Sequence, residues 1–197
     1  MARYFTSDLQ FSQKNIIGYA NRPYRSVEEM DEALIANAWD TVGPNDELII
    51  LGDLAMGQLE KSLQTAGRLP GNKTLLCGNH DRPFRFGPGP KRDEQIKRYE
   101  DVGFTVIVDP WVKDTIYGHD VLLSHFPYTG DSHGEDRYLD RRPPQQDTPL
   151  IHGHVHTAFA RNGNQFNVGV DMNYFMPVSE TAIAHWLDCL AAERAAA

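Results

Sequence analysis

Short apolar segments that end in polar residues are the feature that most constrains the fold of this chain. They are rich in β-branched and large apolar side chains, and such runs are typical of strands that are buried on both faces. The segments cover residues 3–7, 47–51, 74–77, 104–108, 120–124, 149–152 and 165–170. Strands of this kind have to be covered on each side by another layer of the protein.

Helical patterns separate the segments in the first half of the chain. Residues 26–42 carry apolar side chains at helical spacing, and Ser26 with Glu29 matches a capping box. This alternation predicts an α/β sandwich with helices covering the sheets, in preference to a single open doubly wound sheet. Further helices are predicted at 58–69, 91–103 and 178–197, and loops rich in Gly, Pro, Arg and Asp at 81–90 and 128–149.

The composition indicates one soluble domain over residues 1–197. Hydrophobic residues make up 41% of the chain and charged residues 23%, and no apolar run reaches the length of a membrane span. The first residues do not resemble a signal peptide, so we expect a cytoplasmic protein without a membrane partner. The net charge of −8 disfavours stable binding to duplex nucleic acid. Cys77 and Cys189 are expected to be buried free thiols.

Polar residues capable of binding metals follow the ends of several predicted strands. In open α/β sheets the carboxyl ends of the strands border the ligand crevice, so residues far apart in sequence can meet there. Each set alone has a simpler interpretation, since Gly-Asp and Gly-Asn are common turns and a single histidine is often structural. The sets are Asp8 and Gln10, then Asp53, then Asn79, His80 and Asp81, then His125, and finally His152, His154 and His156.

In this order the sets resemble the calcineurin-like metallophosphoesterases. The family pattern is D-x-H, G-D, G-N-H-[DE], a lone His and G-H-x-H. This chain has Gln10 in the first motif where the family has histidine. Residues 7–30 further resemble a small bacterial and phage branch, whose second opening histidine is replaced here by Gln13. The matching residues are Asp8 to Gln10, Gly52-Asp53, Gly78 to Asp81, His125 and Gly153 to His156.

The resemblance implies a metallophosphoesterase-type sandwich of two β-sheets flanked by helices, with two divalent metal ions at the strand ends. Mixed Asp, Asn and His ligands suit Mn²⁺ best here, with Fe, Zn²⁺ or Mg²⁺ as alternatives. Gln10 offers a weaker ligand than histidine, so we expect the Asp8 position to bind metal less tightly, or a water to replace Gln10. The implied ligands are Asp8, Gln10, Asp53 and His156 for one metal, and Asp53, Asn79, His125 and His154 for the other.

The resemblance also implies a mechanism. Two metals would lower the pKa of a bridging water, and the resulting hydroxide would attack phosphorus in line. His80 is the predicted general acid for the leaving oxygen, and Asp81 is predicted to orient it. The alternative for Asp81 is that it only caps a turn.

The two predicted loops are expected to contact the substrate. Arg82 and His133 are candidates to bind phosphate oxygens, and Tyr128 or Phe84 to stack on a base. These residues favour a small phosphodiester, such as a nucleotide or cyclic nucleotide. The alternatives are a metal-dependent nuclease, a phosphomonoesterase, and a binding-only pseudoenzyme with a weakened metal site.

Overall fold

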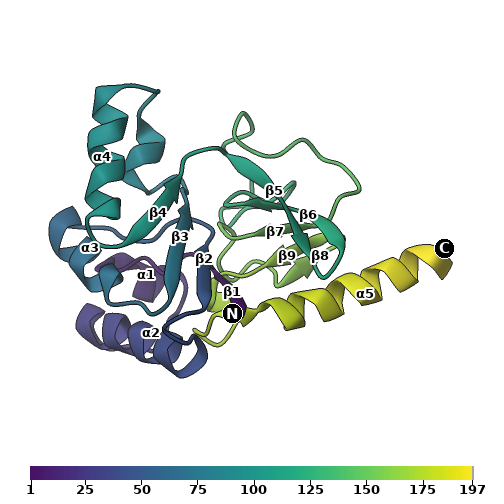
Figure 1. Ribbon diagram of the computed structural model, residues 1–197, viewed down its shortest axis with the longest axis horizontal. Helices are drawn as coiled ribbons and strands as arrows, with labels where there is room; N and C mark the ends of the chain where they lie inside the picture. Colours follow the sequence, from purple (N-terminus) through teal and green to yellow (C-terminus); the bar gives the residue numbers. More distant parts are fainter. Residues whose placement is uncertain (197) are drawn as a thin grey trace.

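Two five-stranded β-sheets lie face to face in the computed structural model, which describes residues 1–196 (Figure 1). In the first sheet, four strands run parallel and β10 is an antiparallel edge strand beside β1. The strand order is β10 (Val178–Ser179), β1 (Arg3–Thr6), β2 (Glu47–Ile50), β3 (Asn72–Leu76) and β4 (Phe104–Ile107).

The second sheet mixes parallel and antiparallel pairs. Its central strand β7 is parallel to both neighbours, and each outer pair is antiparallel. The order is β5 (Trp111–Ile116), β6 (His119–Ser124), β7 (Leu150–His152), β9 (Gln165–Asn167) and β8 (Arg161–Asn162).

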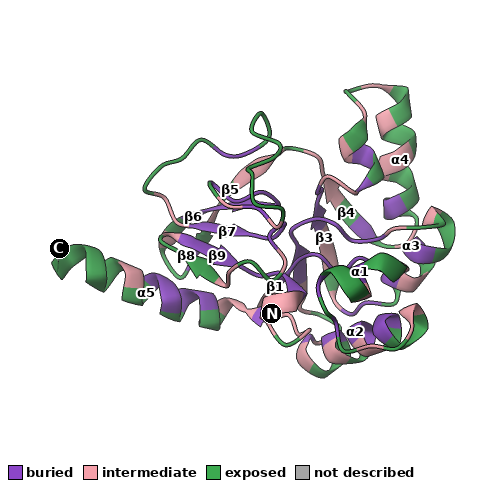
Figure 2. Cartoon of the chain, turned by 180° about the vertical axis from the view of Figure 1, so that it is seen from behind, coloured by how far each residue is buried: buried purple, intermediate pink, exposed green. Residues whose placement is uncertain are grey.

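Helices cover the outer face of the first sheet, and the last helix leaves the body of the molecule (Figure 1). Figure 2 shows that the first turns of α5 are partly buried and that its far end is exposed. The helices are α1 (Lys14–Tyr19), α2 (Val27–Thr41), α3 (Leu59–Gly67), α4 (Pro90–Glu100) and α5 (Glu180–Ala196), with short 3-10 helices η1 (Arg82–Arg85) and η2 (Val170–Met172).

Strand β2 explains why the central segments are apolar without interruption. Successive side chains of a strand point to opposite faces. Leu48 and Ile50 pack in the cluster shared with the helices, whereas Ile49 and the following Leu51 pack in the cluster between the two sheets. Both faces of the first sheet are therefore buried, and the predicted two-sheet sandwich flanked by helices is confirmed.

The long segment between β6 and β7 covers part of the outer face of the second sheet. Tyr128 packs there on Leu122 and Leu150, with Trp111 beside them. The predicted loop at 128–149 is confirmed, because residues 125–149 contain no helix or strand. This loop takes the place that helices occupy on the first sheet.

Local details differ from the sequence predictions at several points. The helix predicted from residue 178 begins at Glu180, because Val178 and Ser179 form β10, and strand β5 was not predicted. Ser26 accepts a hydrogen bond from the Glu29 amide as predicted, but the Glu29 carboxylate accepts from the Arg25 amide and leaves the reciprocal half of the capping box unmade. The segment 81–90, predicted as loop, contains η1. Cys77 is buried and free, whereas Cys189 is free but exposed, because it lies on the side of α5 that does not pack on the sheets.

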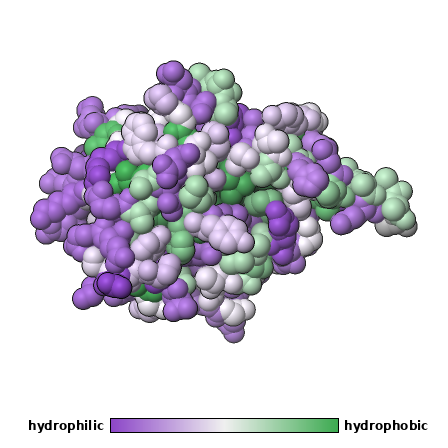
Figure 3. All heavy atoms as spheres, turned by 90° about the horizontal axis from the view of Figure 1, so that it is seen from below, coloured by the Kyte–Doolittle hydropathy of each residue, from purple (hydrophilic) through white to green (hydrophobic). Residues whose placement is uncertain are grey.

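The face of the molecule drawn in Figure 3 is predominantly hydrophilic. Figure 3 shows one face, on which polar side chains surround smaller apolar areas and the end of α5 projects to one side. Within residues 1–196, no helix combines the length and the apolar character needed to cross a membrane.

Candidate metal centre

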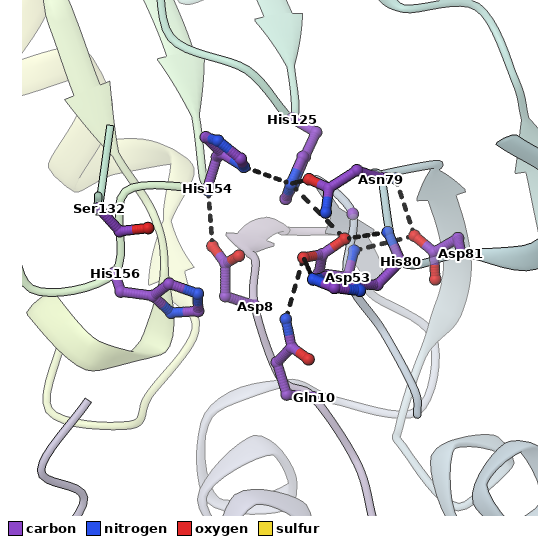
Figure 4. Close-up of polar contacts among 12 residues, drawn as sticks. Asp8, Gln10, Asp53, Asn79, His80, Asp81, His125, Ser132, His154 and His156 are labelled. Atoms are coloured by element: carbon purple, nitrogen blue, oxygen red, sulfur yellow. Dashed lines mark hydrogen bonds and ion pairs between the residues drawn. The ribbon is translucent and has the colours of Figure 1, made fainter. Parts of the chain in front are cut away.

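The strand ends bring the predicted ligands to one edge of the sandwich (Figure 4). Asp8 follows β1, Asp53 follows β2 and Asn79 follows β3 in the first sheet. His125 follows β6 and His154 follows β7 in the second sheet. The site therefore lies where the carboxyl ends of both sheets meet, and each sheet contributes part of it.

The turns that carry these residues have an unusual backbone conformation. Asp8, Gln10, Asp53, His154 and His156 all have a positive φ between 46 and 71°. L-residues rarely adopt this region, and each such residue costs on the order of 1–3 kcal/mol. Backbone strain concentrated in this way is a mark of functional sites, because the fold must stabilise it elsewhere.

Two glycines of the motifs are required by close packing. A Cβ on Gly78 would collide with the Asp53 side chain and backbone, and a Cβ on Gly153 would collide with the side chains of Ser7 and Asp8. Gly78 therefore allows the turns after β2 and β3 to approach each other, and Gly153 allows the turn after β7 to approach the turn after β1 in the other sheet.

His125 presents an unprotonated nitrogen to the centre. Its Nδ1 donates to the Leu51 carbonyl at 2.8 Å, and a carbonyl can only accept, so the proton of the neutral ring lies on Nδ1. Nε2 then carries a lone pair. Around it lie Asn79 Oδ1 at 3.1 Å, His154 Nδ1 at 3.2 Å and Asp53 Oδ1 at 3.5 Å.

His154 presents a second lone pair at the same point. Its Nε2 donates to the Asp131 carboxylate at 3.0 Å, which leaves Nδ1 unprotonated and directed at His125. Burial, and then the neighbouring His125, lower the pKa of His154 to about 3, so the ring is neutral at neutral pH. Two lone pairs and two oxygen acceptors that face one another are unfavourable without a positive charge between them. The donor set fits a divalent cation.

Asp53 lies between this group and the Asp8 side of the centre. Burial would raise the pKa of Asp53, but His125 and then His80 outweigh it, so its pKa lies below the ordinary value. Ligand atoms of Asp8, Asp53 and His125 all lie within 4.8 Å of one another. This buried cluster could hold a metal ion, and a carboxylate between two groups of ligands suits a bridging position.

Asp8 has one carboxylate oxygen free for a metal. Its Oδ2 accepts from the His154 amide at 2.9 Å, whereas Oδ1 is buried and has no hydrogen-bond partner within residues 1–196. Burial raises the pKa of the Asp8 carboxyl, as expected of a carboxylate that lacks a cation. An unpartnered buried oxygen is costly, and a cation would satisfy it.

Gln10 turns its amide toward Asp53. Its Nε2 donates to Asp53 Oδ2 at 2.9 Å, and its Oε1 is buried without a partner among the described residues. The side chain therefore lies in the position expected of a ligand, but it is engaged with the central carboxylate. That Gln10 coordinates a metal stays a prediction.

His156 is oriented by a carboxylate from η2. Its Nδ1 lies 2.8 Å from Asp171 Oδ2, and the Arg22 guanidinium forms a two-pronged ion pair with the same carboxylate. Arg22 also donates to the carbonyls of Asp8 and Leu9. One buried network thus holds both the His156 ring and the turn after β1.

His80 lies at the rim and Asp81 below it. The His80 side chain is 38% exposed, and its Nε2 lies 3.9 Å from Asp53 Oδ2. The Asp81 carboxylate instead accepts from the amides of Asp53, Leu54 and Gly78. Burial, and then Asp53, raise the pKa of Asp81 to about 7.

The prediction that Asp81 orients His80 through a direct contact is therefore wrong. Asp81 holds together the turns after β2 and β3, which is the alternative interpretation of a turn cap. The reason is that its side chain points into the protein from the start of η1, while the His80 side chain points toward the cleft.

Comparison with other proteins places the chain in a family. No protein-family model matches it. It is 36% identical over 184 residues to the Gene 66 protein of Mycobacterium phage L5, covering 85% of this chain and 86% of that protein. The chain belongs to the Gene 66 protein family. The Gene 66 protein of Mycobacterium phage D29 is 33% identical over 177 residues, covering 85% of this chain and 87% of that protein.

A solved structure has the same fold as this Gene 66 family member. It is a protein of unknown function from Aquifex aeolicus, with 28% sequence identity and a TM-score of 0.71. The match covers 94% of this chain and 98% of the Aquifex protein. The shared architecture therefore extends over nearly the whole chain.

A cleft of about 310 Å³ opens above the candidate metal centre of this Gene 66 family member. One wall is formed by Ile16 and Tyr19 of α1 and by Ala20 directly after it. The other wall includes residues of the long loop after β6, namely Ser132, His133 and Arg137, and the floor includes Asp53, Asn79, His80, His154 and His156.

The predicted substrate contacts have different outcomes. His133 lines the cleft, as does Gln13. Tyr128 is 6% exposed, packs under the loop, and donates its hydroxyl to the Thr148 carbonyl, so it is not free to stack on a base. Arg82 is exposed but does not line the cleft. Tyr19, which the sequence did not single out, is the exposed aromatic side chain on the cleft wall.

The supporting carboxylates Asp131 and Asp171 were also missed. Each receives a hydrogen bond from one histidine of the Gly-His-x-His motif. Neither stands in a recognisable motif, since one lies in a polar loop and the other in a short 3-10 turn. Among the residues that support the histidines, Arg22 was the one marked by a sequence feature, the Arg-Pro pair at residues 22 and 23.

Proposed function

We propose that this protein is a metal-dependent phosphodiesterase of the calcineurin-like metallophosphoesterase type. The observation that carries the proposal is the convergence of unprotonated acceptor atoms on His125 Nε2 at the floor of the cleft. A site made of lone pairs and carboxylates needs cations, and with cations it would attract an anionic substrate.

Two groups of residues would hold the metals. Asp53, Asn79, His125 and His154 form the first group, and Asp8, Gln10 and His156 join Asp53 in the second, with Mn²⁺ as the expected ion. When bound, such a pair would supply positive charge that holds phosphate oxygens and lowers the pKa of a water molecule. The chain itself orients the ligands, since Leu51, Asp131 and Asp171 accept hydrogen bonds from the three imidazoles.

His80 is the proposed proton donor to the leaving oxygen. It lines the cleft, its side chain is partly exposed, and its backbone amide donates to Asp53 Oδ1 at 2.9 Å, which fixes the residue at the rim of the centre. A protonated imidazole there can reach an oxygen on a phosphate that is bound over Asp53. Asp81 would support this role indirectly by holding the turn that carries His80.

The cleft favours a small diester, in the form of a nucleotide or cyclic nucleotide. Its volume of about 310 Å³ lies at the low end of small-molecule sites. The apolar wall with Tyr19 suits an organic group or base, and the polar wall with His133 and Arg137 suits phosphate oxygens. A nuclease that binds long strands would need a basic track, which the net charge of −8 disfavours.

Hydrolysis of bis(p-nitrophenyl) phosphate and of a cyclic-nucleotide panel with Mn²⁺ tests the proposal. His80→Ala should lower kcat about 10²- to 10⁴-fold, the usual contribution of a general acid, with the metal content unchanged. A His80→Ala variant that loses metal instead would overturn the role of His80. Arg82→Ala is a matched control, because Arg82 neighbours the site in sequence but does not line the cleft.

A binding-only protein is the second candidate. The observation that favours it is the hydrogen bond from Gln10 to Asp53, which engages an oxygen of the central carboxylate. This candidate predicts that the protein binds Mn²⁺ but hydrolyses no diester of the panel at any Mn²⁺ concentration.

A further inference from the structure

The long loop after β6 contacts His154 of the candidate metal centre in two ways, through a hydrogen bond to the Asp131 carboxylate and through the Tyr138 ring, which lies edge-on to the imidazole with 5.7 Å between the ring centroids. Asp131 Oδ2 accepts from His154 Nε2 at 3.0 Å, while Ser132, His133 and Arg137 farther along the loop line the cleft. The side chain of Asp131 is completely buried, although most residues that follow it are exposed. Asp131 therefore lies between the metal centre and the wall of the cleft.

The same carboxylate organises the loop. Its Oδ1 accepts from the amide of His133 at 3.2 Å and from the Arg137 guanidinium at 2.7 Å. Its Oδ2 accepts from the Arg137 amide at 3.2 Å and from Arg142 at 3.3 Å. Arg142 is itself buried and donates to the carbonyls of Pro127, Gly130 and Arg137. Most of the hydrogen bonds that hold the loop together are therefore accepted by Asp131 or donated by Arg142 beside it.

We propose that Asp131 is a positioning residue that couples metal binding at His154 to the closed form of residues 131–142. It keeps the proton of His154 on Nε2, so that Nδ1 stays available as a ligand. The inference rests on the metal position of the proposed function and extends it to the assembly of the cleft wall.

The coupling has to act in both directions. A cation on Nδ1 makes the ring a stronger donor, which strengthens the hydrogen bond to Asp131 and stabilises the loop around it. By linkage, a loop that is closed around Asp131 increases the affinity of His154 for the cation by the same factor. Metal occupancy would thereby build the wall that presents His133 and Arg137 to a substrate.

Limited trypsin digestion with and without Mn²⁺ measures this coupling. Arg137 and Arg141 are exposed and lie in the segment, whereas the bond after Arg142 precedes a proline and resists trypsin. In the wild type, Mn²⁺ should slow cleavage at these two sites by about fivefold or more relative to protein in chelator, in the range of typical coupling between sites. Mass spectrometry of the fragments gives the rates. An unchanged cleavage rate would overturn the proposal, and this measurement needs no variant.

Asp131→Asn tests the carboxylate itself. The oxygen of the introduced amide would be drawn to the two arginines, so its NH₂ group would face His154 and favour the proton on Nδ1, where it blocks coordination. Mn²⁺ affinity should fall about 10- to 100-fold, the usual effect of losing such an outer partner, and protection by metal should disappear. Titration calorimetry gives the affinity.

Asp136→Asn is the matched control. Asp136 lies in the same loop, accepts from the Gly130 amide and lies 3.8 Å from Arg142 Nη1, but it does not contact His154. This variant should keep the Mn²⁺ affinity and the protection of the wild type. Equal losses in both variants would reduce Asp131 to a structural role and contradict the proposal. If Mn²⁺ protects the loop but no diester is hydrolysed, the coupling stands and the proposed function fails.

Discussion

The two sides of the candidate metal centre differ in how hydrogen bonds arrange their potential ligand atoms. On the side of Asn79, His125 and His154, which we call the histidine side, both rings have a fixed proton and direct lone pairs at one point. On the side of Asp8, Gln10 and His156, the glutamine side, Gln10 donates to Asp53 and the free Asp8 oxygen has no partner among the described residues. Under the proposed function, the histidine side would be preorganised for a cation, whereas the glutamine side would have to rearrange to hold one.

Removing a ligand from the histidine side should have the largest effect. His154→Asn keeps a residue that tolerates the positive φ of this position and removes the Nδ1 ligand. Loss of an outer partner costs about 10- to 100-fold in affinity, so loss of the ligand itself should cost more than about 100-fold. Calorimetric titration with Mn²⁺ measures the change, and circular dichroism checks the fold. An affinity close to that of the wild type would contradict a preorganised histidine side.

Restoring an imidazole on the glutamine side should have a smaller effect of opposite sign. Gln10→His replaces a neutral amide by a stronger ligand, and histidine also tolerates a positive φ. We expect about tenfold tighter binding of one Mn²⁺ and a metal content closer to two ions per chain, in line with the size of single-ligand effects. Metal analysis after dialysis against a chelator measures this content.

Gln13→His serves as its control, because Gln13 lines the cleft and has no hydrogen bond to Asp53. A wild-type protein that keeps two tightly bound metals through the same dialysis would refute the prediction that the glutamine side binds metal more weakly.

The smallest expected effect is a pH dependence of opposite sign on the two sides of the metal-free protein. Burial and His125 lower the pKa of His154 from 6.5 to about 3. Between these values the unfolded chain binds the extra proton, so the free energy of unfolding should fall as the pH drops from 6.5 toward 3. For His156, burial lowers the pKa, but Asp171 and Asp8 outweigh it and leave the pKa raised. Its contribution is complete below pH 6.5 and is lost as the pH rises through the raised pKa.

Urea unfolding in chelator separates the two contributions. His154→Asn should flatten the loss of stability in acid, and His156→Asn should flatten the loss above pH 6.5. Identical pH profiles for the two variants would contradict the predicted opposite contributions of His154 and His156.

Much of the fold could be predicted from the chain because its central strands are buried on both faces. The uninterrupted apolar segment at Leu48 to Leu51 required a layer on each side, and the helices and the second sheet supply them. The elements α1, β5, β8 and β10 were not predicted. Of these, α1, β8 and β10 have few residues and depend on tertiary contacts, whereas β5 is an edge strand in which polar residues interrupt the apolar ones. Tyr128 was misplaced for a related reason, since only the packing of the loop on Leu122 and Leu150 buries it.

The meeting of the candidate ligands at one edge could be predicted from the order of the residues alone. Asp8, Asp53, Asn79, His125 and the two histidines of the Gly-His-x-His motif follow strand ends, and strand ends of such sheets meet at one edge. The folded chain was needed to show which carboxylate supports each imidazole, that Gln10 faces Asp53, and that Asp81 holds the turns instead of His80. The physical reason is that strand ends are positioned by the backbone ladder, which sequence periodicity reveals, whereas loop carboxylates are positioned by contacts between segments distant in the chain.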